Sequence, residues 1–154
     1  MYTNQYRDVF TTISRGFHAV KATATVPQST THDIFLVTVG RVIVTALIGE
    51  VTVAIGAGTT PDLKVTVAPT TGTAYDVASD VVIASDEIGT LYSVEGDGTA
   101  LLTTSSGAIT TCVGQGFVVQ IGTIRIATSE STVGSTKWDL YYFPLDDGAV
   151  VASA

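Results

Sequence analysis

The sequence predicts an all-β fold, a jelly-roll-like or other Greek-key β-sandwich. Three observations support this prediction. Short runs rich in valine, isoleucine and threonine recur along the chain, turn-forming residues separate them, and no long helical period interrupts them. Turn signals spaced about every 8–12 residues are typical of sandwiches and barrels. A βαβ fold would need helices between the strands.

The expected strands start after residue 33 and continue to the end of the chain. They are the segments 34–39, 41–48, 50–55, 63–67, 81–83, 89–94, 101–102, 109–113, 117–121, 123–127 and 137–143, followed by a weak tail rich in small residues. Gly40 and Gly49 are expected to end the first two strands. The nearly continuous apolar runs at 34–39 and 42–48 predict cover on both faces, with a second subunit as one cover.

Residues 1–32 form a separate part, an N-terminal arm, and residues 33–154 form one β-sandwich domain. Apolar side chains within 6–17 recur at three- and four-residue intervals, which predicts one short helical stretch in the arm. Its β-branched residues weaken that helix. An ordinary first helix packed on the domain's own core is the open alternative. Residues 23–27 are expected to be extended.

The charge composition excludes several classes of partner. Seven basic residues face 14 acidic ones, giving a net charge of −7, and charged residues make up only 14% of the chain. Without a basic cluster, binding to nucleic acid or to an anionic membrane is not expected. The longest apolar stretch, 42–57, is too interrupted for a membrane helix. No signal peptide is visible, which suits a protein made in a cytoplasm.

No catalytic or metal-binding motif emerges from the residues. The acidic pairs Asp86-Glu87 and Asp146-Asp147 lie beside glycines and match turns better than a calcium loop. His18, His32 and Cys112 form no recognisable triad or metal spacing, and Cys112 is expected to be buried and structural. We therefore expect no enzyme activity, no metal and no cofactor.

The last long strand, 137–143, carries a cluster of aromatic side chains. Alternation places Trp138 and Tyr142 on one face and Tyr141, Phe143 and Asp139 on the other. Exposed aromatic rings would suit sugar binding. The favoured interpretation is a core strand whose faces meet the opposing sheet and a neighbouring subunit.

Three groups of segments carry a family resemblance. They are 44–51 (VTALIGEV) with 54–58 (AIGAG), 69–72 (PTTG) with 89–92 (GTLY), and 134–149 (GSTKWDLYYFPLDDGA). In combination they resemble the small Thr/Gly/Ala-rich cement or decoration proteins of tailed bacteriophage capsids. The resemblance covers most of 34–151 and does not include the arm.

The resemblance implies a non-enzymatic virion protein on the capsid exterior that binds the major capsid protein and clamps neighbouring capsomers. A homotrimer is expected, with a homodimer as the alternative. The competing functions are a tail or head–tail connector protein and a carbohydrate-binding module. Shell contact is expected at Tyr6, Phe10, Ile13 and Phe17 of the arm. Self-association is expected at Val42, Val44, Leu47, Trp138, Tyr141 and Phe143.

Overall fold

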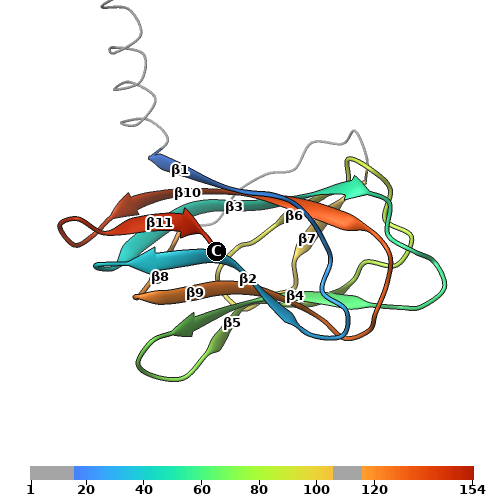
Figure 1. Ribbon diagram of the computed structural model, residues 1–154, viewed down its shortest axis with the longest axis horizontal. Coiled ribbons are helices and arrows are strands. Elements are labelled where there is room, and N and C mark those ends of the chain that lie inside the picture. Colours follow the sequence, from blue (N-terminus) through green and yellow to red (C-terminus); the bar gives the residue numbers. More distant parts are fainter. Residues whose placement is uncertain (1–15, 106–115) are drawn as a thin grey trace, which may run out of the picture.

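The chain folds into two antiparallel sheets packed face to face, as the sequence predicts (Figure 1). The computed structural model describes residues 16–105 and 116–154. Within them lie eleven strands and no helix. The strands are β1 (Phe17–Thr25), β2 (Thr31–Thr38), β3 (Val42–Val53), β4 (Asp62–Pro69), β5 (Tyr75–Val82), β6 (Leu91–Ser93), β7 (Leu102–Thr104), β8 (Phe117–Val119), β9 (Gly122–Thr128), β10 (Ser135–Pro144) and β11 (Val150–Ser153).

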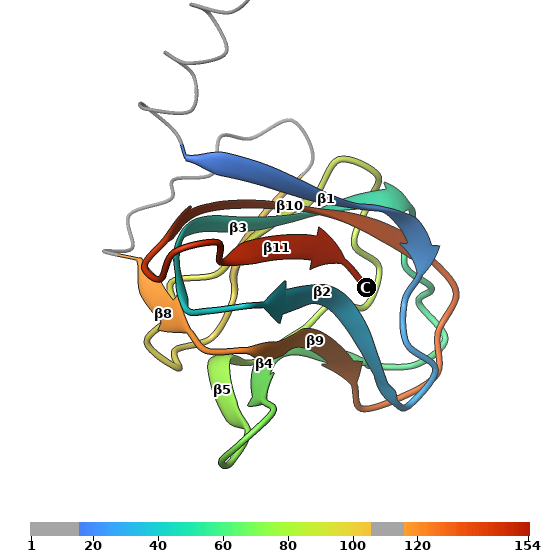
Figure 2. The same ribbon diagram turned by 60° about the vertical axis from the view of Figure 1, so that its left-hand side comes forward.

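The strand order is that of a jelly roll. One sheet, sheet A, has the order β1-β10-β3-β6-β7, with β8 also paired to β3, and sheet B has the order β11-β2-β9-β4-β5. In the pairs β1–β10, β2–β9, β3–β6 and β4–β5, the two strands become progressively closer in the sequence. This is the pattern of a jelly roll, in which one long antiparallel ribbon is wound into two sheets. Figure 2 shows β11 beside β2, with β9 on the other side of β2.

The prediction that the arm extends to residue 32 is wrong, because the second half of the arm belongs to the sandwich. Phe17–Thr25 is strand β1, which pairs with β10 from Phe17 opposite Tyr142 to Thr25 opposite Ser135. This strand is difficult to recognise in the sequence, because β1 is an edge strand and most of its side chains are exposed on both faces. Its hydrophobic alternation is correspondingly weak. The predicted helical stretch falls mostly on residues outside the described part, as do strand 109–113 and Cys112.

Gly49 does not end a strand, contrary to the expectation. β3 runs through it without a break from Val42 to Val53. Gly49 lies directly opposite Trp138 of β10, and a Cβ atom on Gly49 would lie 2.8 Å from the indole ring. The glycine leaves the space that the ring occupies. Gly40, by contrast, does lie in the turn between β2 and β3.

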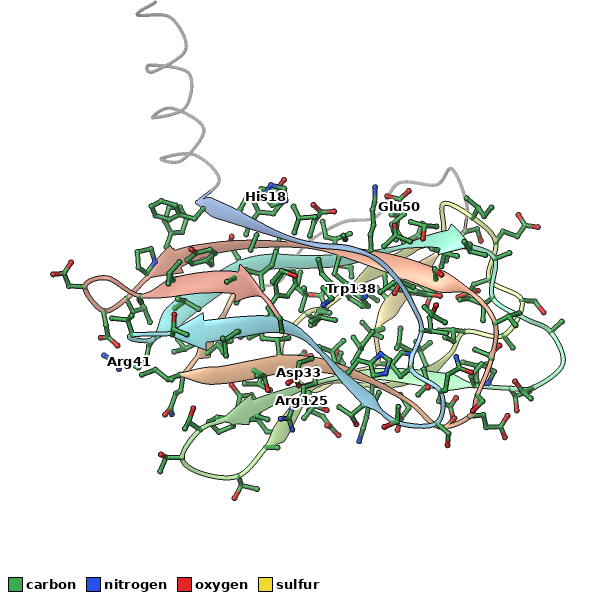
Figure 3. All side chains as sticks on the ribbon, viewed as in Figure 1. His18, Asp33, Arg41, Glu50, Arg125 and Trp138 are labelled. Atoms are coloured by element: carbon green, nitrogen blue, oxygen red, sulfur yellow. The ribbon has the colours of Figure 1, made fainter. Side chains whose placement is uncertain are left out.

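The core fills the space between the sheets. Trp138 is 1% exposed and packs near Tyr92, with ring centroids 6.3 Å apart. Its Nε1 donates a hydrogen bond to Thr136 Oγ1 at 3.1 Å, so the buried polar atom is satisfied. Figure 3 shows Trp138 between the two layers. The other large, fully buried side chains include Phe35, Ile34, Leu47, Leu63, Ile83, Ile124 and Leu140.

Replacing Gly49 with alanine should destabilise the domain, because the new methyl group overlaps the Trp138 ring. Overpacking of this kind costs about 1–3 kcal/mol in the free energy of unfolding. Urea denaturation measures the change.

The matched control is Gly58→Ala, since no atom lies within 4 Å of a Cβ built there. The Gly58 variant should unfold close to the wild-type urea concentration. Equal midpoints for the two variants would contradict the role given to the Gly49–Trp138 contact.

Candidate interaction surfaces

Four of the residues predicted to mediate self-association lie in the core. Val42, Val44 and Leu47 are 0% exposed and Trp138 is 1% exposed, so none of them is available to a second copy. That part of the prediction is wrong, because the inward side of β3 and β10 is covered by sheet B. The apolar run 42–48 conceals an alternation of buried and half-buried positions.

Tyr141 and Phe143 lie on the opposite, outward side of β10 and are half-buried. This is the alternation that the sequence predicted for the aromatic strand. Among the predicted shell contacts, Phe17 is 47% exposed at the start of β1, with its ring centroid 5.6 Å from that of Tyr142. Tyr6, Phe10 and Ile13 lie outside the described residues.

The outer face of sheet A is rich in apolar side chains. Strand register places Val20, Asp139, Ile48, Ser93 and Leu102 in one row across five strands, of which only Ser93 is fully buried. A second row holds Phe143, Ile43 and Val118. Val20, Leu102 and Val118 are each more than 40% exposed. An apolar sheet face of this kind marks a contact surface.

The charges on this face are paired with one another. His18 Nε2 lies 2.7 Å from Asp139 Oδ1, and the imidazole stacks on the Tyr141 ring at a centroid distance of 4.4 Å. Lys137 Nζ lies 2.7 Å from Glu50 Oε2, and this contact raises the pKa of Lys137. In Figure 3, His18 and Glu50 point away from sheet A on the side opposite sheet B. Paired charges lower the cost of covering the face with another protein.

The outer face of sheet B carries ion pairs and hydrogen bonds, together with the exposed apolar side chains of Leu36, Val82 and Val150. Arg125 Nε donates to Asp33 Oδ1 at 2.7 Å and to Thr123 Oγ1 at 2.9 Å. Asp76 accepts a hydrogen bond from Thr66 Oγ1 at 2.7 Å and lies 3.4 Å from Lys64 Nζ. These contacts tie neighbouring strands together across the sheet. Both outer faces pair their charges, and sheet A presents the more apolar face because the half-buried Ile43, Ile48, Tyr141 and Phe143 lie on it beside the exposed Val20, Leu102 and Val118.

One end of the sandwich is held by an arginine–aspartate contact. Arg41 follows β2 and Asp146 follows β10, and the guanidinium donates to both carboxylate oxygens at 2.9 and 2.8 Å. The Arg41 backbone N–H also donates to Asp146 Oδ2 at 2.7 Å. The Arg41 side chain holds the pKa of Asp146 down at about 2. The turn 38–41 is thereby fixed against the turn 144–149.

A cleft of ≈560 Å³ opens between β1 and β2 at the edge of the sandwich. Lys21, His32, Asp33 and Arg125 are among its lining residues, with Trp138 deeper inside. The carbohydrate alternative requires an exposed Trp138 or Tyr142, and these side chains are only 1% and 4% exposed. The cleft therefore offers no aromatic platform for a sugar ring.

Asp86 and Tyr92 form a partly buried polar pair. Tyr92 Oη donates to Asp86 Oδ2 at 2.6 Å. Burial raises the pKa of both groups, and the hydrogen bond opposes the rise for Asp86. The described residues hold no group of three or more potential metal ligands. They also contain no helix long and apolar enough to cross a membrane.

Comparison with known proteins does not extend these observations: no family model matches the chain, and no significant similarity to a curated protein or a solved structure is found.

Replacing Asp146 with asparagine should lower stability at pH 7 and have progressively less effect as the pH falls. The pKa of Asp146 is lower in the folded chain, about 2, than in the unfolded chain, ~3.9. Its stabilisation is therefore complete above pH ~4 and is lost as the pH falls toward 2. Urea midpoints of wild type and variant should differ at pH 7 and converge near pH 2.

Asp80→Asn, at an exposed position of β5, serves as the control and should leave the midpoint nearly unchanged. A difference between Asp146→Asn and wild type that stays constant from pH 7 to pH 2 would show that the carboxylate charge is not what stabilises this end.

Proposed function

We propose that this chain is a non-enzymatic structural virion protein that binds the outer surface of a tailed-phage capsid and stabilises contacts between major capsid proteins. It acts as a cement or decoration protein on the capsid exterior. The observation that carries the proposal is the outer face of sheet A, which is apolar at Val20, Leu102 and Val118 and pairs its own charges. Such a face is suited to burial against another protein.

The chemistry of the surface supports a protein partner in preference to nucleic acid or membrane. The net charge of −7 opposes contact with packaged DNA. The rigid two-sheet scaffold presents its contact face without the cost of ordering a flexible loop. The 26 threonines supply polar surface at little charge. This composition suits a subunit that is surrounded by many neighbours.

The fold class is compatible with the proposal and does not select it. Jelly rolls occur in viral capsid proteins, lectins and cupins, and a fold alone does not define a function. The likeness of 44–51 with 54–58, of 69–72 with 89–92, and of 134–149 to phage cement proteins provides the more specific support. A symmetric homo-oligomer, with three copies preferred over two, is part of the proposal.

A tail or head–tail connector protein is the competing structural role, and copy number separates it from cement. Quantitative mass spectrometry of purified particles that contain this chain should give hundreds of copies per particle, of the same order as the major capsid protein. A handful of copies, or a small multiple of one ring, would instead assign the chain to the tail or the connector.

Shell binding should depend on the outer face of sheet A. The double variant Val20→Thr/Val118→Thr keeps the side-chain shape and adds two hydroxyl groups that must be desolvated in a contact. Binding to shells depleted of this protein, measured by co-sedimentation, should weaken about tenfold.

Val150→Thr on sheet B is the matched control, because Val150 lies on a strand and its exposure, 42%, is close to that of Val20 and Val118. It should bind like the wild type. Equal weakening in both variants, or none in the double variant, would mean that this face does not contact the shell.

A further inference from the structure

The turns at one end of the sandwich carry exposed apolar side chains that the fold itself does not use. This end, at the left of Figure 1, consists of residues 38–41, 70–71, 120–121 and 144–149, and is here termed the turn end. Val39 is 68% exposed, Leu145 is 48% exposed and Ile121 is 42% exposed. They come from three different connections between strands.

Val39 has a strained backbone in addition to an exposed side chain. Its φ is +70°, and the Gly40 N–H donates to the Thr38 carbonyl oxygen at 2.9 Å. This is a γ-turn with positive φ, a rare and strained form. A β-branched residue is poorly suited to that conformation, which glycine or asparagine adopts more easily. Because most of the side chain is in solvent, packing within one copy does not account for a valine here.

The turn end is rigidly supported. Arg41 and Asp146 hold its two largest turns together, and the Leu145 N–H donates to the Arg41 carbonyl oxygen at 2.9 Å. A Cβ atom on Gly40 would lie 2.5 Å from Asp146 Cβ, so these turns are in close contact. The apolar tips are therefore held in place before any partner arrives, which lowers the entropic cost of binding.

A hollow lies beside the tips. Val39, Arg41, Thr70, Thr71 and Ile121 contribute to the lining of a cleft of ≈380 Å³. Leu145 projects from the adjoining turn and is not among the lining residues. The same end thus holds both an apolar projection and a hollow that Val39 and Ile121 line beside polar residues including Gln120 and Asp146, and a self-complementary surface requires such a projection and recess.

The distribution of charge favours a second copy of the chain at this end. At the opposite end, the Ile83 N–H donates to the Pro61 carbonyl oxygen and the Thr60 N–H donates to Glu130 Oε2, so three connections lie together. Those connections hold Asp62, Asp86, Glu87 and Glu130, and no Lys or Arg occurs in 53–62, 83–90 or 129–134. Two acidic ends repel each other.

The turn end, by contrast, carries charges of both signs. The Arg41 side chain is 57% exposed although it contacts Asp146, and Asp147 is exposed on the next turn. When two turn ends meet around a rotation axis, Arg41 of each copy can face Asp147 of the other.

We propose that copies of this chain associate through their turn ends, with Leu145 of one copy seated against Val39 and Ile121 of the next. The proposal names the self-contact of the oligomer and rests on the proposed function only for the expectation of self-association. It leaves the outer face of sheet A available to a different partner.

Sedimentation equilibrium of the full chain tests the proposal. The wild type should show two or three times the 15.9 kDa of one chain. Val39→Asn should raise the dissociation constant about tenfold or more, while its melting temperature, compared with the wild type at a dilution where both are monomeric, stays equal or rises because the backbone strain is relieved. The dissociation constant and the melting temperature therefore change independently. A variant that merely unfolds would instead lose association and melting temperature together.

Val133→Asn is the matched control, since Val133 is 71% exposed and lies in the turn 129–134 at the opposite end. It should leave the mass unchanged. Asp147→Arg should weaken association at low salt, because it places like charges opposite each other. A monomeric wild type, an unchanged mass for Val39→Asn, or a fall in its melting temperature would overturn the proposal. Because this test uses isolated protein, its failure leaves the copy-number test of the proposed function intact.

Discussion

The close packing of Trp138 on Gly49 is the contact on which the architecture depends. It joins β10 to β3 in the middle of sheet A and places the largest buried side chain of the domain between the sheets. Tyr92 of β6 packs near the same ring, and Tyr92 in turn binds Asp86 in the connection that leads into β6. One aromatic side chain thus links three strands and a turn. The register of β10 against β3 at this contact determines which of the neighbouring side chains point outward.

That alignment separates the molecule into surfaces with different properties. The inward positions of β3 and β10 form the core, and the outward positions form an apolar face with paired charges. The outer face of sheet B is less apolar, with ion pairs and hydrogen bonds beside exposed Leu36, Val82 and Val150. The two ends differ as well, one being acidic and the other bearing exposed valine, leucine and isoleucine beside the Arg41–Asp146 contact. We interpret this division as the basis for separate contacts with a shell and with further copies.

The sequence was sufficient for the fold class and for most strands from residue 34 onward, because β-branched runs and turn residues are local signals. It was insufficient for β1, whose partner β10 lies more than 100 residues away and whose exposed residues show little alternation. Gly49 was misassigned for a related reason. A glycine that makes room for a distant tryptophan has the same local appearance as one that ends a strand.

The candidate surfaces were predictable only in part. Alternation placed Tyr141 and Phe143 outward correctly, yet the apolar run 42–48 suggested a subunit contact where the structure has half core and half surface. The sequence did not mark Val39, Ile121 and Leu145 as candidate contact residues, since single apolar residues in turns are common. Their significance comes from a backbone angle and from the meeting of three turns at one end. Neither is visible without the fold.

The position of β10 in the middle of sheet A also has a consequence for synthesis. Both β1 and β3 pair with β10, and β10 occupies residues 135–144, near the end of the described chain. Sheet A therefore lacks the strand between β1 and β3 until residues 135–144 have left the ribosome. Until then, β1 and β3 remain without their shared partner, and the apolar side of β3 has no completed core to enter. The first strands of sheet A must wait, unpaired on this side, for the synthesis of about a hundred further residues.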